Sequence, residues 1–196
     1  PDPRQNAVES ISIVFSEAVD SFSNGNLRLT HDGGANLLAG TEGLTTSDHA
    51  TFTLSGLSVL TRAAGDYELT LVSNDAVIHD AAGNFLNGAV IETWTFEGIA
   101  IELAADGRLL ITERSPTGLN GNLTVTTIGA DLVIRDPTNV LTAAVGSAIS
   151  DHEVRVPVAS FPGGQVVVEL GPGDDLFDAS VVTNVPFFVD TGGGND

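Results

Sequence analysis

Short apolar runs broken by turn-forming residues are the feature of this chain that most restricts its fold. In residues 10–16, Ile11, Ile13 and Phe15 occupy every second position, the spacing that places side chains on one face of a β-strand. Turn-forming pairs such as Asn24-Gly25 follow at short intervals. The pattern predicts an all-β chain of many short strands.

The length predicts two modules. A chain of 196 residues matches two β modules of about 100 residues each. The pattern of predicted strands and turns changes near Gly98. Domains are therefore expected at residues 1–98 and 99–196. Further strands are expected at residues 27–30, 52–54, 57–60, 67–72 and 92–96, and then at 99–103, 108–112, 123–128, 132–135, 154–158, 166–170 and 186–189.

Charge and composition exclude several classes of partner. The 26 acidic residues outnumber 7 basic ones, and the net charge of −19 repels nucleic acids and anionic membranes. No apolar run approaches the ~20 residues that span a bilayer. Without cysteine there is neither a disulfide nor a thiolate metal site. Such an acidic surface suits divalent cations, high-salt water or simple solubility.

The first residues have the character of a linker. The chain opens on Pro1-Asp2-Pro3 and contains no methionine. We therefore expect an internal segment of a longer exported protein, whose export signal lies upstream.

Four stretches of the first module form a recognisable pattern: residues 11–19, 65–71, 80–84 and 94–96. In order and spacing they resemble the bacterial Ig-like domains repeated in S-layer and large surface proteins. The resemblance implies an Ig-like β-sandwich that acts as a spacer or adhesive unit and has no catalytic residues to transfer. Gly83 is expected in a tight loop, in a backbone conformation that a Cβ would penalise.

The second module ends in a glycine-rich repeat. The stretch Gly-Pro-Gly-Asp-Asp-Leu-Phe-Asp at residues 171–178 is echoed by Gly-Gly-Gly-Asn-Asp at 192–196. Aligning Gly171 with Gly192 also aligns Asp175 with Asp196, which gives a period of 21 residues. This periodicity predicts the start of a stacked β-solenoid.

Both copies are similar to the calcium-binding nonapeptide of RTX proteins, although Leu170 and Thr191 stand where that family has its first glycine. The period of 21 also exceeds the ~18 residues of two nonapeptides, so one corner is expected to be looser. The resemblance implies Ca²⁺ between successive turns, because one turn alone cannot supply six to eight oxygens. It implies Asp175 and Asp196 as carboxylate ligands.

The neighbouring Asp174, Asp178 and Asn195 complete the candidate ligands of this repeat. The alternative is that both copies are ordinary turns whose Asx side chains bond to nearby backbone. With the repeat as the start of a solenoid, residues 99–170 are expected to form a non-repetitive β cap that covers the open edge of the first turn.

Other candidate sites are weaker. Asp75, Asp80 and Asn84 are placed to line a second calcium loop, with Asx turns as the alternative explanation. The four histidines lack a paired zinc spacing. No serine lies in a nucleophile motif, and adjacent carboxylates such as Asp174 and Asp175 cannot flank a sugar ring at the ~5–9 Å that glycoside hydrolysis requires.

These observations predict a non-catalytic structural or adhesive spacer of a large extracellular or cell-surface bacterial protein, with calcium-stabilised glycine-rich repeats. The expected partners are neighbouring modules of the same chain, a surface array formed by self-association, or a glycan or protein adhesion partner; nucleic acid and membrane insertion are excluded. The alternative is a glycan-binding accessory module of a secreted polysaccharide-degrading enzyme. That alternative requires an exposed aromatic platform.

Overall fold

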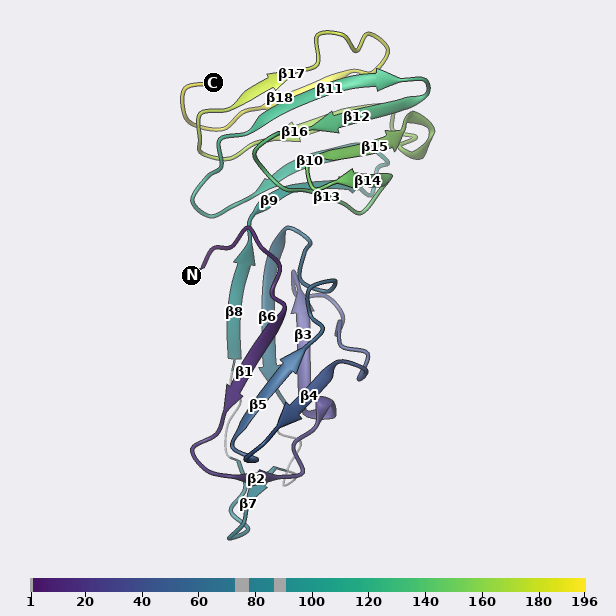
Figure 1. The fold of residues 1–196 in the computed structure, drawn as a ribbon. Helices are drawn as coiled ribbons and strands as arrows, with labels where there is room; N and C mark the ends of the chain where they lie inside the picture. The colour runs from purple at the N-terminus through teal and green to yellow at the C-terminus, as the bar shows by residue number, and fades with distance from the viewer. Residues whose placement is uncertain (1, 73–77, 87–90) are drawn as a thin grey trace.

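The computed structural model describes residues 2–72, 78–86 and 91–196, and these residues fold as the predicted all-β chain (Figure 1). Strands β1 to β8 form the lower part of Figure 1 and strands β9 to β18 form the upper part. The first eight are β1 (Ser10–Val14), β2 (Val19–Asp20), β3 (Leu27–His31), β4 (Gly43–Thr46), β5 (Thr51–Ser55), β6 (Gly65–Leu71), β7 (His79–Asp80) and β8 (Ile91–Phe96), with one 3-10 turn at Asn24–Asn26.

Two antiparallel sheets make up most of the first module. One has the order β1-β5-β4 and the other β3-β6-β8, while β2 and β7 pair at the far end. Inward residues of both sheets share one buried cluster. On β6 the alternation is regular, because Tyr67, Leu69 and Leu71 are buried whereas Asp66 and Glu68 are exposed. The period-two pattern of the sequence therefore identifies the core face.

Aromatic side chains pack against one another within this core and beside it. The Phe15, Phe22 and Phe52 rings pack edge to face, with centroids 4.8 to 5.8 Å apart. The Tyr67 and Trp94 rings are stacked with centroids 5.3 Å apart. Edge-to-face and offset-stacked rings are the favoured geometries of aromatic pairs.

The strand predicted at residues 57–60 is wrong. Leu57 is fully buried, but its carbonyl accepts hydrogen bonds from the N–H groups of Leu60 and Thr61, so the segment is a turn. The Thr61 side chain joins this turn to the segment before β1, since its Oγ1 accepts a hydrogen bond from Val8 N at 2.9 Å. A short apolar run can be a buried turn as readily as a strand when side-chain bonds satisfy its backbone.

The second module contains two five-stranded sheets, with orders β13-β9-β10-β16-β18 and β14-β15-β12-β11-β17. Their facing sides enclose a second buried cluster, rich in Val, Leu and Ile. The strands are β9 (Gly98–Leu103), β10 (Leu109–Arg114), β11 (Asn122–Ile128), β12 (Asp131–Arg135), β13 (Leu141–Ala143), β14 (Ser147–Ser150), β15 (Glu153–Pro157), β16 (Val166–Glu169), β17 (Leu176–Asp178) and β18 (Phe187–Asp190), with a 3-10 turn at Val158–Ser160.

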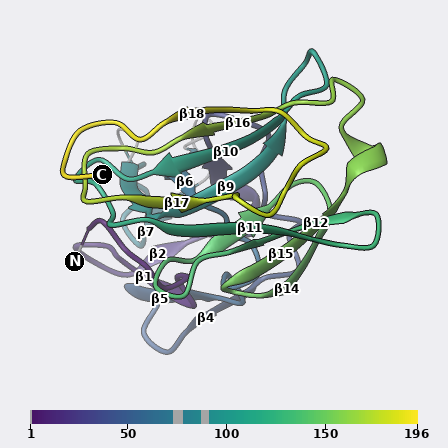
Figure 2. The same ribbon diagram turned by 90° about the horizontal axis from the view of Figure 1, so that it is seen from above.

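Parallel pairing links the later strands of both sheets. Strand β16 lies between β10 and β18 and is parallel to both, while β17 is parallel to β11. Figure 2 shows the chain running from β16 to β17 and returning as β18. We call residues 109–128 pass 1, residues 166–178 pass 2 and residues 187–196 pass 3. Residues 99–170 are thus more than a cap, because β10 and β11 already follow the path of β16 and β17.

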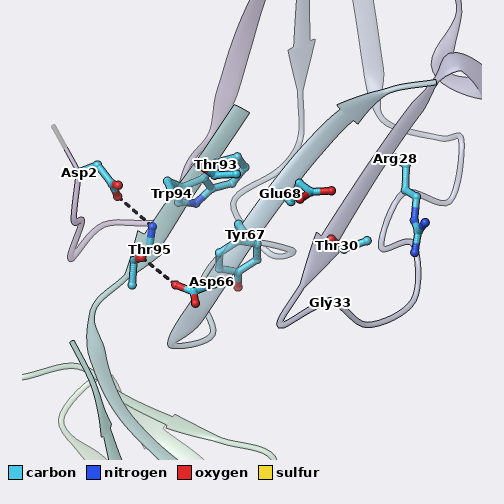
Figure 3. Close-up of a pocket in the computed structure, with 10 residues that line it drawn as sticks. All are labelled: Asp2, Arg28, Thr30, Gly33, Asp66, Tyr67, Glu68, Thr93, Trp94 and Thr95. Carbon is cyan, nitrogen blue, oxygen red and sulfur yellow. Dashed lines mark hydrogen bonds between the residues drawn. The ribbon is translucent and has the colours of Figure 1, made fainter. Parts of the chain in front are cut away.

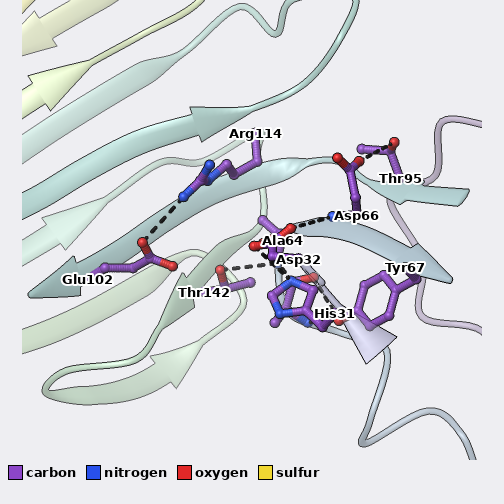
Figure 4. A network of polar contacts seen from close by, with 10 residues as sticks. His31, Asp32, Ala64, Asp66, Tyr67, Thr95, Glu102, Arg114 and Thr142 are labelled. Atoms are coloured by element: carbon purple, nitrogen blue, oxygen red, sulfur yellow. Dashed lines mark hydrogen bonds and ion pairs between the residues drawn. The ribbon is translucent and has the colours of Figure 1, made fainter. Parts of the chain in front are cut away.

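The two modules meet through a short polar network (Figure 4). Ala64 N in the first module donates to Thr142 Oγ1 in the second at 3.3 Å, and His31 Nε2 lies 3.1 Å from Ala64 O. On the second module, Arg114 and Glu102 form an ion pair at 3.4 Å. Only Glu97 separates β8 from β9, so the connection between the modules is nearly a continuous strand.

The turn at residues 57–61 gives a first prediction. Thr61→Val keeps the side-chain volume but leaves the buried N–H of Val8 without its acceptor, which should lower the free energy of unfolding by about 1–3 kcal/mol. Thr53→Val, at an exposed position of β5, is the matched control and should change it by less than about 0.5 kcal/mol. Urea unfolding at equilibrium measures both, and equal losses would contradict the role of Thr61.

Candidate functional site: the glycine-rich corner

The 21-residue interval read from the sequence is the register in which passes 2 and 3 pair. Val166 lies opposite Phe187 and Glu169 opposite Asp190 in the parallel ladder of β16 and β18, and each pair differs by 21 residues. An isolated parallel bridge between Pro172 and Gly193 keeps the same interval at the corner that follows. Equivalent residues of the two glycine-rich stretches are therefore stacked on each other.

Glycine permits the close approach of the passes at this corner. A Cβ on Gly173 would collide with the carbonyl oxygen of Leu119 in pass 1. Gly194 has φ +156° and its Cβ would collide with the carbonyl of Gly173. A side chain at either position would push the passes apart, so the glycines are required by backbone packing.

Asx side chains join the passes in a first row, formed by Asn120, Asp174 and Asn195. Asp174 N donates to Asn120 Oδ1 at 3.0 Å, and Asn195 N donates to Asp174 Oδ1 at 2.9 Å. Each side chain thus accepts from the backbone of the following pass. The contacts satisfy N–H groups at the corner, beyond the ends of the strand ladder.

A second row runs in the opposite sense and is formed by Gly121, Asp175 and Asp196. Gly121 N donates to Asp175 Oδ1 at 2.6 Å, and Asp175 N donates to Asp196 Oδ1 at 3.0 Å. Here each carboxylate accepts from the backbone of the preceding pass. The two rows together bond neighbouring passes reciprocally, and hydrogen bonds to a charged acceptor are the stronger kind.

Asp175 is the buried acidic residue of the two rows. It is 4% exposed, and its Oδ2 has no hydrogen-bond partner among the described residues. Burial raises the pKa of the Asp175 carboxyl; the Gly121 N–H acts in the opposite direction, and the charges of Asp196 and Asp174 raise it further. A buried oxygen without a donor is costly, so this atom marks a place where a proton or a cation would be stabilised.

Glu113 of β10 lies beneath the same corner. Its Oε1 accepts from Leu119 N at 2.9 Å and its Oε2 accepts from Gly171 N at 3.2 Å. Burial raises the pKa of Glu113 despite these two donors, and the charge of Asp175 adds to the effect. Two acids with raised pKa values therefore share the space between passes 1 and 2.

Asp136 anchors the corner from the other side and remains ionised. It is fully buried; its Oδ1 accepts from the N–H groups of Thr138 and Asn139, and its Oδ2 accepts from Asn122 N. Burial alone would raise the pKa of Asp136, but these N–H donors lower it below its ordinary value. Asn139 extends the anchor, because its Nδ2 donates to Asn120 O at 2.9 Å.

The sequence did not identify Asp136 and Glu113 as parts of this corner. The stretch Asp136-Pro137-Thr138-Asn139 is a readable Asx-turn signal. Its bond to Asn122, 14 residues earlier, depends on how β11 and β12 pair and has no sequence signature.

The remaining predicted ligands lie apart from the corner. Asp178 is exposed at the end of β17, where its Oδ1 accepts from Ser180 N at 2.9 Å, and this bond lowers its pKa. Asp80 binds Asn84 through both oxygens, at 2.8 Å to N and 2.7 Å to Nδ2; these bonds, from the side-chain amide first, lower its pKa. These bonds form an Asx turn, the alternative given for the predicted calcium loop, and Gly83 has φ +82° as expected. Asp75 lies outside the described residues.

The corner meets part of the requirement for a calcium site. Asp175 keeps one buried oxygen without a partner, and the 21-residue register places Asp196 next to it through the Asp175 N–H. No three His, Cys, Asp or Glu side chains are grouped for metal binding in the part of the chain that the structure describes. An ion at this corner would therefore need backbone carbonyls and water to complete six to eight oxygens.

A shallow hollow on the outer side of the β3-β6-β8 sheet bears on glycan binding (Figure 3). Its volume is about 470 Å³, and polar or charged side chains such as Asp66, Glu68 and Arg28 line it. Tyr67 and Trp94 also border it but are 1% and 2% exposed. Neither ring offers the open platform on which a sugar would stack.

No helix among the described residues has the length and apolarity needed to cross a membrane. The chain matches no protein family model, no curated protein and no solved structure.

The Asp136 anchor gives a second prediction. Asp136→Asn turns an NH₂ group toward N–H donors and should lower the free energy of unfolding by about 2–4 kcal/mol. The exposed Asp151→Asn is the control and should stay within about 0.5 kcal/mol of the parent. Urea unfolding at pH 7 checks this, and two equal, small changes would show that Asp136 does not hold the corner.

A third prediction concerns pH. The folded-state pKa of Asp175 is raised above its ordinary 3.8, so the folded chain binds this proton more tightly than the unfolded chain. Its contribution to stability is then present at low pH and is lost as the pH rises through the raised value, by at most about 1.4 kcal/mol per pH unit. In chelator, Asp175→Asn should match or exceed the parent at pH 7 and fall behind it toward pH 4. A stability difference that does not change with pH would contradict the assignment.

Proposed function

We propose that this chain is a non-catalytic structural segment of a large exported or cell-surface bacterial protein. The observation that carries the proposal is the reciprocal bonding of the two Asx rows. In these rows the acidic side chains of the corner accept hydrogen bonds from the backbone of neighbouring passes and so hold the passes together. An enzyme would instead collect such groups around a cavity, facing a substrate. Here they hold the backbone together.

The first module fits the part of an Ig-like spacer. Its two three-stranded sheets and shared aromatic core are the kind of arrangement that such a domain uses. The near-continuous run from β8 into β9 favours a stiff connection to the next module. A spacer of this kind transmits position and force along a chain of modules, and its partners are the neighbouring modules.

The second module fits the start of a calcium-dependent solenoid. Asp175, with its free Oδ2, and the second oxygens of Asp174 and Asp196 are the groups that would hold Ca²⁺, together with corner carbonyls. When bound, the ion would supply positive charge beside carboxyls that have no cationic partner among the residues the structure describes. Millimolar calcium outside the cell saturates sites as weak as ~10⁻⁴ to 10⁻³ M, so folding of the corner would be coupled to export.

The test is thermal unfolding of the full chain in calcium and in chelator, with magnesium as the ionic control. Calcium at 100 times its Kd should stabilise the folded chain by about 2.7 kcal/mol, and Asp175→Asn should abolish this gain. Asp178→Asn, at an exposed position of the same module, should retain it. If calcium acts no differently from magnesium on the parent chain, the calcium part of the proposal is wrong.

A further inference from the structure

The first module has an apolar groove between the open edges of its two sheets. Its volume is about 520 Å³, within the ~300–1,000 Å³ typical of ligand sites. We call it the edge groove; β1 forms one wall, Glu92 and Trp94 of β8 form the other, Leu69 and Leu71 form part of the floor, and Arg4 closes one end. In Figure 1 β1 and β8 both lie on the left side of the first module, the side away from β3 and β4.

The wall formed by β1 offers an unused strand edge. Phe15 N donates to Ala50 O at 2.8 Å, in line with the β1–β5 ladder, so the odd-numbered residues of β1 bond to β5. In an antiparallel ladder the alternate residues turn their N–H and C=O groups the other way. Ser10, Ser12 and Val14 therefore present backbone donors and acceptors away from β5, where the structure describes no paired strand.

The wall formed by β8 has already begun to pair along its outer edge. Arg4 N donates to Thr95 O at 2.9 Å, and Glu97 N donates to Arg4 O at 2.6 Å, which makes a one-residue parallel bridge. On the same edge of β8, Asp2 Oδ1 accepts a hydrogen bond from Thr95 N (Figure 3). Thr93 is next on the same edge and has no strand partner there among the described residues. An added strand would continue the pairing that Arg4 starts.

Two buried donors at the Arg4 end lack acceptors. Trp94 Nε1 and Arg4 Nε are both buried without a hydrogen-bond partner in the described part of the chain, and Trp94 is 2% exposed. The Arg4 guanidinium lies 5.7 Å from the centre of the Trp94 ring. Buried N–H groups of this kind call for a carbonyl or carboxylate. At the other end Glu92 supplies a negative charge, so the groove is electrostatically polar along its length.

We propose that the edge groove binds an extended peptide segment of a partner protein, with alternate apolar side chains, a carboxylate at the Arg4 end and a basic residue at the Glu92 end. The free strand edges favour a peptide over an acyl chain, because only a peptide pairs with them as an added strand. Residues 10–16 of the β1 wall span about 20 Å, the length of a short strand. This docking site would add adhesion to the proposed spacer and does not depend on calcium.

Trp94 makes the groove directly observable, because it is the only tryptophan of the chain. The probes are two synthetic octapeptides in which Thr and Val alternate between a terminal Lys and a terminal Glu, one in each chain direction. One of them should bind saturably, change the Trp94 fluorescence and shift the single indole N–H signal in an NMR spectrum. A peptide with Ser in place of Val should bind at least tenfold more weakly.

Edge variants test the mode of binding. Ser12→Pro removes an N–H that faces away from β5 and should weaken binding by about tenfold, the loss expected for one hydrogen bond, whereas Ser12→Ala should not. Arg4→Gln keeps the backbone bridge to Thr95 and should remove the preference for one peptide direction. A thermal unfolding scan confirms that each variant is folded.

Three results would overturn the proposal: no binding of either peptide, equal binding by Ser12→Pro and Ser12→Ala, or displacement of the indole signal by decanoate alone, which would assign the groove to an acyl chain. Each can be obtained in chelator. Failure of the calcium test and failure of peptide binding are therefore distinguishable.

Discussion

The second module depends on how backbone N–H groups are satisfied where strands give way to corners. Within a parallel ladder every pass bonds to the next, but the ladder ends at the corner, where buried amides still need acceptors. The carboxylates of Asp174 and Asp175 supply them in opposite directions, and Asp136 supplies them to pass 1. Acidic side chains therefore serve here as part of the backbone hydrogen-bond network, which explains why a segment so rich in Asp can be packed tightly.

That use of carboxylates separates two electrostatic outcomes in one small region. Asp136 receives enough N–H bonds to outweigh its burial, so its charge stabilises the folded chain at neutral pH. Asp175 and Glu113 receive fewer, and burial dominates. The corner thus contains one carboxylate, Asp136, whose charged form is stabilised by hydrogen bonds. It also contains two carboxyls, Asp175 and Glu113, whose charged form is destabilised by burial. Either a proton or a cation at these two carboxyls would offset the cost of their burial, so the proposed calcium binding should compete with protonation.

Sequence periodicity predicted the parts of the fold that repeat locally. The alternation of Tyr67, Leu69 and Leu71 identified a core face, and the 21-residue interval between Asp175 and Asp196 matched the register of passes 2 and 3. Pass 1 was not predicted, because it is offset from pass 2 by 57 residues at Leu109↔Val166 and by 54 at Asn122↔Leu176. An unequal offset leaves no period to detect, and buried anchors such as Asp136 depend on contacts that only this pairing creates.

The two modules differ in how hydrogen bonding continues beside their strands. In the second module, β16 has a parallel partner on each side and the Asx rows continue the bonding beyond the strands. In the first, β1 and β8 face each other across a groove whose bonding stops after the single bridge at Arg4. Edge strands with free donors and acceptors attract further strands. Strands β17 and β18 of the second module are also edge strands, but β1 and β8 border an apolar groove that an added strand could fill, as the proposed peptide site requires.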